Sequence, residues 1–568
     1  MKMSQFTALL KVLFISRYRG EKKSGKFDPL WIVYGALALV LVPLVAGICW
    51  LVAVYTPKFQ DDNTLPYFLL MIYMTVMLAV LVFGMVGMLT YVYINRDAEF
   101  LAGLPVKGWK IFLAKLCMVY IGELALSAGF ILPIGFTVGI AGGYGFAFFL
   151  SVVLSVLFVP ALPLLLASLI SIPLMYCVSF FKNKGATTSI VVLVLVGGIY
   201  ALYFSLTLLF QGGGMSDAQL EQSVENLVGA MGAMRYALYP VYALIEFGMR
   251  LPAFGLTGAG AQILSLAASL ASLAALAAAA GLIANFVYGR SAAAQLENSA
   301  KRAKKAMAYK AQSPLRALIR KEWRALIRET AFAFQCLFGT VIGPVMVVVL
   351  SLNLKDGFAA VPDAVNGATE AAGAGAIDPA VFSVIMSGVI VAVIIMIVSG
   401  MNITAATAVS REGKNFYQMK TMPVPYKTQI KAKLYLSLLI SMPGSLISFC
   451  IGAFLIPIPI VEALLDALFL CVYAYLFACF ALRMDLMKPK LNWTTPTQAV
   501  KNNRSSTMPI MLNLLAGLVV GGIFVAVGLF ADALLAIGVL LVLAVALAPV
   551  LHKYLFGSVD RLFEEIEP

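Results

Sequence analysis

The chain has 568 residues, 62% of them hydrophobic and only 12% charged, and its mean hydropathy is +0.95. Soluble domains are about 45–50% apolar and about 25% charged, so this composition excludes a soluble globular protein and leaves a membrane protein. The net charge of +14 would suggest nucleic acid in a soluble protein. In this chain the cations lie mainly in the segments between apolar runs, as in membrane proteins. No nucleic-acid partner is therefore expected.

Apolar runs recur along the whole chain, and each is long enough to cross a bilayer as a helix, which takes about 20 residues. They predict an all-α, polytopic membrane protein of about 12 transmembrane helices. In the fourth run Pro160, Pro163 and Pro173 are each expected to kink the helix, so a broken helix is open there. The expected spans lie near 30–54, 67–94, 111–140, 145–180, 188–210, 262–289, 332–354, 379–409, 434–457, 460–482, 509–530 and 532–555.

Basic residues alternate with these spans as the positive-inside rule requires for a chain with both termini in the cytoplasm. The segments that would face the cytoplasm hold 37 of the 41 Lys and Arg residues. The other four, Lys58, Arg235, Arg250 and Lys355, would face outward. One span too many would have scrambled this alternation, so the sequence predicts cytoplasmic N- and C-termini.

Two basic segments have the pattern of helices that lie in the membrane interface. One is residues 4–23, and the other is ALIRKEWRALIRET at 317–330, where apolar residues recur at helical spacing with Arg and Lys opposite. Such cations extend toward lipid phosphates, so membrane lipid is an expected partner. Of the outer segments, 211–260 is expected to contain a further interfacial helix, and the Gly/Ala-rich 355–378 is expected to be flexible.

The chain also resembles itself at an offset of six spans. NRDAEFLAGLPVKGWKIFLAK at 95–115 follows the second span, and SREGKNFYQMKTMPVPYKTQIKAK at 410–433 follows the eighth. When the Leu-Pro-Val of the first is aligned on the Met-Pro-Val of the second, Lys115 meets Lys433. An offset of six spans keeps both halves in one orientation, which predicts two parallel six-helix repeats. The expected parts are an N-terminal half at 1–290, a basic cytoplasmic linker at 291–313 and a C-terminal half at 314–568.

Each repeated element begins with charged residues, continues as a short helix and turns at its proline, which cannot continue the helix. A short helix and turn that projects from the membrane suits the docking of a cytoplasmic partner, whereas plain solvated loops are the simpler interpretation. Recurrence in both halves favours docking. The candidate residues are Arg96, Asp97, Glu99, Phe100, Leu104 and Pro105 in the first element and Arg411, Glu412, Phe416, Met422 and Pro423 in the second.

Both elements resemble those of type 2 membrane subunits of ATP-binding cassette (ABC) exporters, in particular the long bacterial permeases that fuse two six-span halves. DLMKPKLNWTTPTQAVKNNRSS at 485–506 and the segment ALIRKEWRALIRET also resemble this family. The N-terminal half departs from the pattern, because KNKGATT at 182–188 stands where the C-terminal half has its longer KLNW segment. The functional symmetry of the halves is therefore open.

The resemblance implies an exporter permease that is not itself an enzyme and lies in a bacterial cytoplasmic membrane. Two copies of a cytoplasmic ABC ATPase would drive it, each gripping one of the two elements. ATP and Mg would be held by that ATPase, and no cofactor is expected in this chain, which has no GxxxxGK[ST] phosphate loop. Because the halves are fused, no second permease is expected. The cargo is expected to be hydrophobic or amphipathic.

Few charges lie inside the apolar runs, and each is a candidate functional site. Glu123 is expected either to form a polar site within the third span or to pair with a cation near the headgroups. Glu462 and Asp466 are expected at the outer rim of the tenth span. The single His552 and the seven scattered cysteines predict no catalytic constellation and no metal site.

Three other functions stay open. A secondary transporter of the major facilitator type also has twelve spans in two parallel halves, but the chain lacks that family's GxxxDRxGRR pattern and has few buried charges for a proton relay. A membrane enzyme acting on lipid would need a catalytic constellation that is not found. A non-transporting ABC-like assembly or sensing component is the third.

Overall fold

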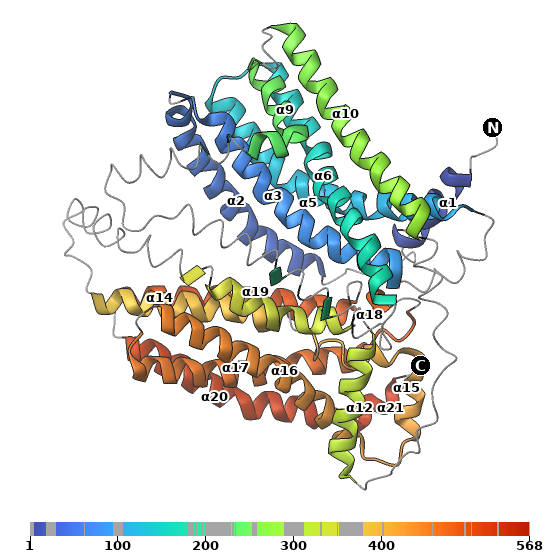
Figure 1. Ribbon diagram of the computed structural model, residues 1–568. Helices are drawn as coiled ribbons and strands as arrows, with labels where there is room; N and C mark the ends of the chain where they lie inside the picture. Colours follow the sequence, from blue (N-terminus) through green and yellow to red (C-terminus); the bar gives the residue numbers. More distant parts are fainter. Residues whose placement is uncertain are drawn as a thin grey trace. The chain divides into compact units, whose positions relative to one another are not determined.

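All regular elements in the described parts of the chain are helices (Figure 1). It divides into two compact units, one made of 1–28, 38–184 and 220–304 and the other of 29–37, 185–219 and 305–568. The predicted halves at 1–290 and 314–568 stay a prediction. The computed structural model describes residues 5–18, 30–61, 63–94, 106–179, 234–252, 258–288, 312–329, 332–348, 350–351, 379–399, 403–456, 458–493, 496–500, 503–530 and 533–566, with isolated residues between 187 and 232.

Within those residues, eight helices are long and apolar enough to cross a membrane. A ninth would be a bent pair in which Pro314–Arg328 and Phe332–Val348 meet at 94°. The chain is therefore a membrane protein, whereas the total of about 12 spans and the side of each terminus stay predictions. The eight helices lie at Leu65–Met85, Gly108–Ala141, Phe146–Leu174, Ala259–Phe286, Tyr426–Leu455, Ile460–Met487, Ser505–Phe524 and Ile537–Glu565.

The first unit is a bundle whose core comes from five of its helices, α2, α3, α5, α6 and α9. Its helices α5 and α6 approach closely at Gly135, where a Cβ would lie 2.5 Å from Cγ1 of Val152. Its elements are α1 (Gln5–Tyr18), α2 (Leu30–Asp61), α3 (Leu65–Met88), η1 (Leu89–Ile94), α5 (Gly108–Ala141), α6 (Phe146–Ser179), α9 (Tyr239–Met249), α10 (Ala259–Ile283) and η2 (Ala284–Tyr288).

The prolines of α6 do not break it, so the broken helix left open for 145–180 is not found. Tyr120 of α5 donates a hydrogen bond of 2.7 Å to the Leu157 carbonyl, in the turn before Pro160. A neighbouring helix thus contacts the backbone in the turn before this proline.

The interfacial helix expected within 211–260 stays a prediction, because residues 211–228 lie outside the described residues. The helix described in this segment is α9, and it is buried: Val241, Ala243 and Leu244 are fully covered in the first unit. Pro240 lies in its first turn, where the missing N–H costs nothing. Residues 355–378 and most of the predicted span 188–210 lie outside the described residues.

The second unit packs its long helices side by side, with the shorter ones at one end (Figure 1). The predicted span 379–409 is too long, because the helix ends at Ser399 and turns follow at 403–409. Besides Phe332–Val348, the elements are α12 (Pro314–Arg328), α14 (Pro379–Ile394), η3 (Ile395–Ser399), η4 (Ser410–Asn415), α15 (Phe416–Thr421), α16 (Tyr426–Leu455), α17 (Ile460–Met487), α18 (Pro496–Val500), α19 (Arg504–Phe530), α20 (Ala533–Phe556) and α21 (Val559–Glu565).

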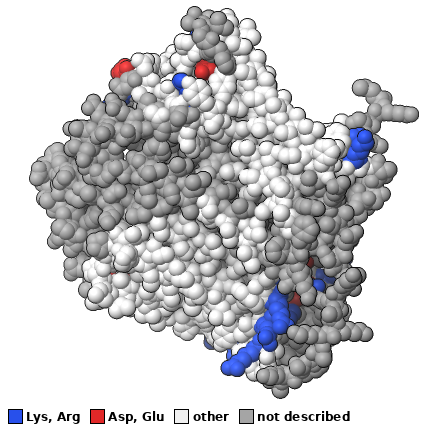
Figure 2. All heavy atoms as spheres, viewed as in Figure 1, with Lys and Arg blue, Asp and Glu red and all other residues white. Residues whose placement is uncertain are grey.

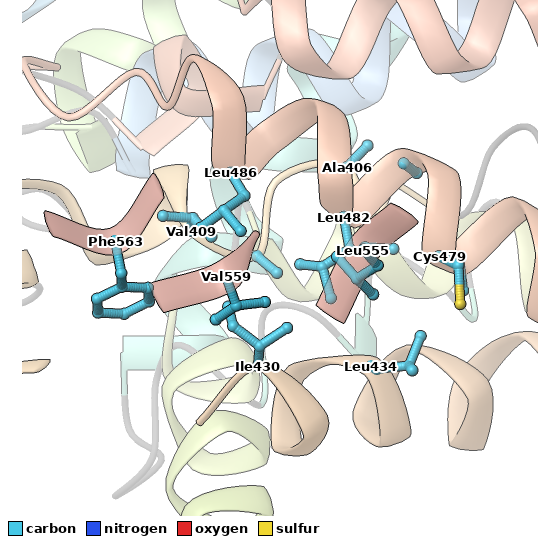
Figure 3. Packing of buried hydrophobic residues seen from close by; sticks show 14 of the residues in the cluster. Ala406, Val409, Ile430, Leu434, Cys479, Leu482, Leu486, Leu555, Val559 and Phe563 are labelled. Carbon is cyan, nitrogen blue, oxygen red and sulfur yellow. The ribbon is translucent and has the colours of Figure 1, made fainter. Parts of the chain in front are cut away.

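At the end of this unit where α16 begins and α17 and α20 end, apolar side chains form one buried cluster (Figure 3). Val409, Ile430, Leu482, Leu555 and Phe563 come from five different elements and are all covered. Burial of apolar surface stabilises by about 25 cal/mol per Å². The cluster therefore fixes the 403–409 turns and the short helices beside them against the long helices.

Candidate functional site

The first part of the second repeated element, residues 410–425, lies directly on that cluster and is held in place by specific contacts. We call this part the element 410–425. It starts with the 3₁₀ turn η4, where Gly413 has φ +55°. A side chain is strained in that conformation, and a Cβ would also lie 2.8 Å from Cε2 of Trp493. Glycine is therefore required where the element passes beneath the Trp493 ring.

Proline sets both ends of the turn after α15. Met422 is extended (φ −71°, ψ 131°) because it precedes Pro423, and α15 ends there. Pro425, also extended, begins α16. Gln429 of α16 donates from Nε2 to the carbonyls of Met419 and Val424, each at 3.0 Å, and so satisfies carbonyls that the end of α15 leaves free.

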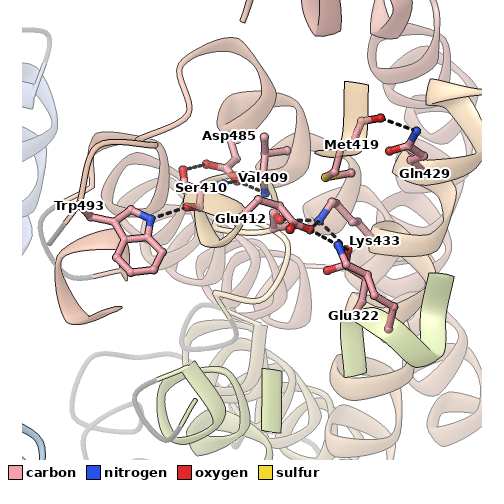
Figure 4. A network of polar contacts seen from close by, with 11 residues as sticks. Glu322, Val409, Ser410, Glu412, Met419, Gln429, Lys433, Asp485 and Trp493 are labelled. Atoms are coloured by element: carbon pink, nitrogen blue, oxygen red, sulfur yellow. Dashed lines mark hydrogen bonds and ion pairs between the residues drawn. The ribbon is translucent and has the colours of Figure 1, made fainter. Parts of the chain in front are cut away.

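A buried carboxylate anchors the start of the element (Figure 4). Asp485 of α17 is fully buried and accepts hydrogen bonds from the backbone N–H groups of Val409 at 2.6 Å and Ser410 at 3.0 Å. It also accepts one from the Ser410 hydroxyl. Hydrogen bonds to a charged acceptor are about twice as strong as neutral ones, so Asp485 fixes the backbone where the turns enter η4.

Ser410 is also joined to the segment after α17. Its hydroxyl oxygen accepts hydrogen bonds of 2.9 Å from the Lys490 backbone N–H and from Nδ2 of Asn503. Its carbonyl accepts one of 2.9 Å from Nε1 of Trp493. Three residues of the segment 485–506, which resembles the ABC exporter permeases, thus contact the first residue of the element.

A buried ion cluster holds the other side of the element (Figure 4). Lys433 of α16 is 1% exposed, and its Nζ lies 2.8 Å from Oε1 of Glu322 on α12 and 2.8 Å from Oε1 of Glu412 on η4. It also donates to the Ala408 carbonyl at 2.8 Å. Lys321 completes the cluster, 2.7 Å from Glu412. Two cations and two carboxylates therefore join α12, η4 and α16.

The charge balance of this cluster determines the ionisation of Glu412. Burial raises the pKa of its carboxyl, but the cations of Lys433 and Lys321 outweigh burial and hold that pKa well below its ordinary 4.5. Glu412 therefore stays ionised at neutral pH. Removing one member of a buried pair leaves an uncompensated charge and typically costs about 3–5 kcal/mol.

Of the five predicted residues of the second element, Arg411, Glu412 and Phe416 face inward, Met422 is half-buried and Pro423 is exposed. Phe416 is fully buried, Glu412 is in the ion cluster, and Arg411 donates from Nη1 to Sγ of Cys336 at 3.1 Å. Tyr417 and Gln418 are exposed as well. Sequence reasoning therefore located the element but missed most of its outward face. It also missed Asp485, whose signal is a carboxylate in an apolar run, and Glu322, which lies between Lys321 and Trp323 in a basic helix.

The first element, with Arg96, Asp97, Glu99, Phe100, Leu104 and Pro105, lies outside the described residues. Next to it, Lys115 of α5 is fully buried and donates from Nζ to the Val92 carbonyl at 3.3 Å. The same ammonium lies 5.9 Å from the centre of the Tyr91 ring. Glu123 is half-buried on α5, and its role stays a prediction.

The interfacial-helix pattern at 317–330 is confirmed as a helix, α12. Its apolar face, with Leu318 and Leu326, is covered, and Lys and Arg side chains gather over its other side (Figure 2). Trp323 is 41% exposed, between the two faces. Contact of this surface with lipid stays a prediction.

The rim assigned to Glu462 and Asp466 is wrong. Asp466 is fully buried in the second unit and Glu462 is 9% exposed, so α17 turns both carboxyls inward. The Ser387 hydroxyl of α14 is the polar neighbour of Asp466. No charged residue lies in α14, in the second halves of α16 and α19 or in the first half of α20.

No metal-binding group of three or more His, Cys, Asp or Glu residues occurs in the part of the chain that the structure describes. Nδ1 of His552 lies 2.6 Å from the Tyr475 hydroxyl at the end of α20. That arrangement is a side-chain hydrogen bond at the helix end and assembles no catalytic set.

The fold defines an α-helical membrane protein with several candidate spans. At one end of its second unit, the polar network anchors the element 410–425 to the long helices. A model of the protein family described as "Putative ATP-binding cassette" matches residues 30–364, more than half of the chain. The chain belongs to this ATP-binding cassette family. No curated protein and no solved structure matches it.

The family's name raises the question of a nucleotide site in this chain. The nearest sequence to a phosphate loop is Gly20–Lys26, GEKKSGK, which has the GxxxxGK spacing. Phe27 follows it in place of the Ser or Thr whose hydroxyl binds Mg²⁺. The segment lies before the matched range and outside the described residues.

Proposed function

We propose that the chain is the transmembrane permease subunit of an ABC exporter in a bacterial cytoplasmic membrane. It would move a hydrophobic or amphipathic cargo with energy from two copies of a separate cytoplasmic ATPase, which hold the ATP and Mg. Because both halves are in one chain, no second permease is needed. The chain itself would not be an enzyme.

The observation that carries this proposal is the anchoring of the element 410–425. Asp485 ties its start to α17, and Lys433 ties it to α16 and α12. A force applied to α15 would therefore reach three helices of the unit without first reordering a loop. That is the property required of an element through which one subunit drives another.

Two further observations support a permease role over a nucleotide-binding one. Within the matched range 30–364, the described elements are helices, most of them long and apolar. A nucleotide-binding domain needs a strand followed by a phosphate loop, and the sequence has no complete GxxxxGK[ST]. ATP would then be bound by a partner.

One observation favours a second candidate, a secondary transporter. The low number of buried carboxylates argues against a proton relay, yet Asp466 is fully buried among apolar helices. Intramembrane carboxylates of this kind mark ion pathways in transporters. A requirement for a proton gradient, without any ATP requirement, would support this second candidate.

The test is to express the chain with the ABC ATPase encoded beside it and to purify the complex through the membrane chain. The proposal predicts a complex with two ATPase subunits per chain and vanadate-sensitive ATP hydrolysis. Absence of any bound ATPase, or hydrolysis by the ATPase alone at the same rate, would contradict it. The adjacent reading frame is the first thing to check.

A further inference from the structure

The C-terminal helix α21 packs against the element 410–425, although about 140 residues separate them in the sequence. Phe563 of α21 is fully buried, with its ring centre 5.0 Å from that of Phe416 and 4.5 Å from that of Tyr426. The Tyr426 and Phe563 rings are stacked, 18° from parallel. One side chain of α21 thus fills the space between the start of α15 and the start of α16.

Two polar contacts accompany this packing. Lys420 of α15 donates to the Glu564 carbonyl at 3.0 Å, and Lys427 of α16 lies 3.2 Å from Oδ2 of Asp560. Lys427 and Asp560 are both more than half exposed, and exposed pairs of this kind contribute little. The buried Phe563 ring is therefore the main link between α21 and the element.

Two side chains of α15, Phe416 and Met419, are buried in the apolar cluster, and the side chains between them are exposed. Tyr417 is 53% exposed, beside the exposed Gln418. The neighbouring α21 exposes Arg561, Glu564 and Glu565. An exposed tyrosine held on a rigid backbone has the character of an interface anchor, because its large ring is buried on binding with little loss of side-chain freedom.

We propose that α21 and α15 together form the docking surface for the nucleotide-binding subunit. In this surface Tyr417 is the anchor that enters the partner, and Phe563 is a positioning residue that holds α15 at the correct angle. This inference rests on the proposed function for its partner. The packing of α21 on α15 is independent of that partner and is tested separately.

The experiment uses the full chain in lipid nanodiscs and measures two quantities: the Kd for the purified ATPase subunit, and hydrogen exchange at residues 416–424. The variants are Phe563→Ala, a chain ending at Ser558, and Tyr417→Ala. Phe563→Leu is the conservative rescue. Tyr435→Ala, which removes an exposed tyrosine of α16 away from α15 and α21, is the matched control.

Phe563→Ala and the shortened chain are expected to weaken ATPase binding by about tenfold or more and to speed exchange at 416–424. Phe563→Leu is expected to restore most of both. Tyr417→Ala is expected to weaken binding about as much with unchanged exchange, since its side chain is exposed. Tyr435→Ala is expected to change neither. A variant that weakens binding without changing exchange identifies an anchor, whereas one that changes both identifies a positioning residue.

An unchanged Kd for the shortened chain would overturn the composite surface, and unchanged exchange at 416–424 would overturn the positioning role of Phe563. If the unaltered chain binds no ATPase at all, the proposed function fails. In that case the exchange measurement still decides whether α21 holds α15, so the two failures are distinguishable.

Discussion

Lys115 in the first unit and Lys433 in the second occupy the same place in the aligned elements, and both are buried. Lys115 donates to the Val92 carbonyl and Lys433 to the Ala408 carbonyl, so each reaches back to the chain just before its element. Lys433 also meets two carboxylates, one of them from α12. The acidic residues of the first element, Asp97 and Glu99, lie outside the described residues. The two lysines thus share a backbone contact, and at Lys433 the described carboxylates extend it to α12 and η4.

The largest expected effect is that of removing the Lys433 ammonium. Lys433→Met leaves Glu322 and Glu412 buried with reduced compensation, and we expect a loss of about 3–5 kcal/mol in the free energy of unfolding, measured by denaturant unfolding in micelles. The triple variant with Glu322→Gln and Glu412→Gln should recover most of it. Lys115→Met tests the shared backbone contact in the first unit. No recovery in the triple variant would contradict the role of the two carboxylates.

Asp485 is the next test, because it holds the element from the side of α17. Asp485→Ala leaves two backbone N–H groups and the Ser410 hydroxyl without this acceptor, and each buried unsatisfied group costs about 1–3 kcal/mol. We expect a loss of about 2–4 kcal/mol and faster hydrogen exchange at 409–415. Asp485→Asn, which keeps one acceptor oxygen, should lose less. Unchanged exchange after Asp485→Ala would remove Asp485 from the anchor.

A smaller effect is expected at Gly413. Gly413→Ala places a Cβ against the Trp493 ring and strains a backbone at φ +55°, which costs about 1–3 kcal/mol. Tryptophan fluorescence reports the displacement of Trp493, and unfolding in micelles gives the free energy. As a control, Gly522→Ala, at a helical glycine where a Cβ meets nothing within 4 Å, should be neutral. A fluorescence spectrum unchanged by Gly413→Ala would contradict the close approach.

The smallest effect concerns pH. Because the pKa of Glu412 is lower in the folded chain than its ordinary 4.5, the unfolded chain binds the extra proton. The stability from this carboxylate is therefore fully present above about pH 5 and is lost as the pH falls below 4.5 toward the folded pKa. The stability difference between the native chain and Glu412→Gln should be constant from pH 7 to about pH 5 and shrink below that. A difference that grows on acidification would contradict the assignment.

Much of the fold follows from hydropathy, because apolar stretches of bilayer length have few alternatives to helices. The errors are at polar–apolar borders. The segment after Ser399, GMNITAATAV, has no charged residue, so hydropathy extended that span through the turns at 403–409. The burial of the short helix α9 was not predicted, because local sequence does not report the cover that α6 and α10 provide.

The sequence predicted where the site lies in the chain, but not which residues contact one another there. Pro423 and the resemblance to ABC exporter permeases located the element 410–425, and the alignment of the two elements paired Lys433 with Lys115. Glu322 and Lys433 are 111 residues apart in the chain, and sequence spacing carries no information about a contact at that separation. The same holds for Asp485 and for Phe563, whose roles depend on how the second unit packs.

The central claim is that the anchored element 410–425 couples this membrane chain to a separate ATPase. The most direct measurement is the vanadate-sensitive ATPase rate of the purified complex when residues 414–425 are replaced by a Gly/Ser linker of equal length. The account predicts loss of the bound ATPase, or loss of its regulation by the membrane chain, with the spans still folded. An intact complex with an unchanged rate would contradict it.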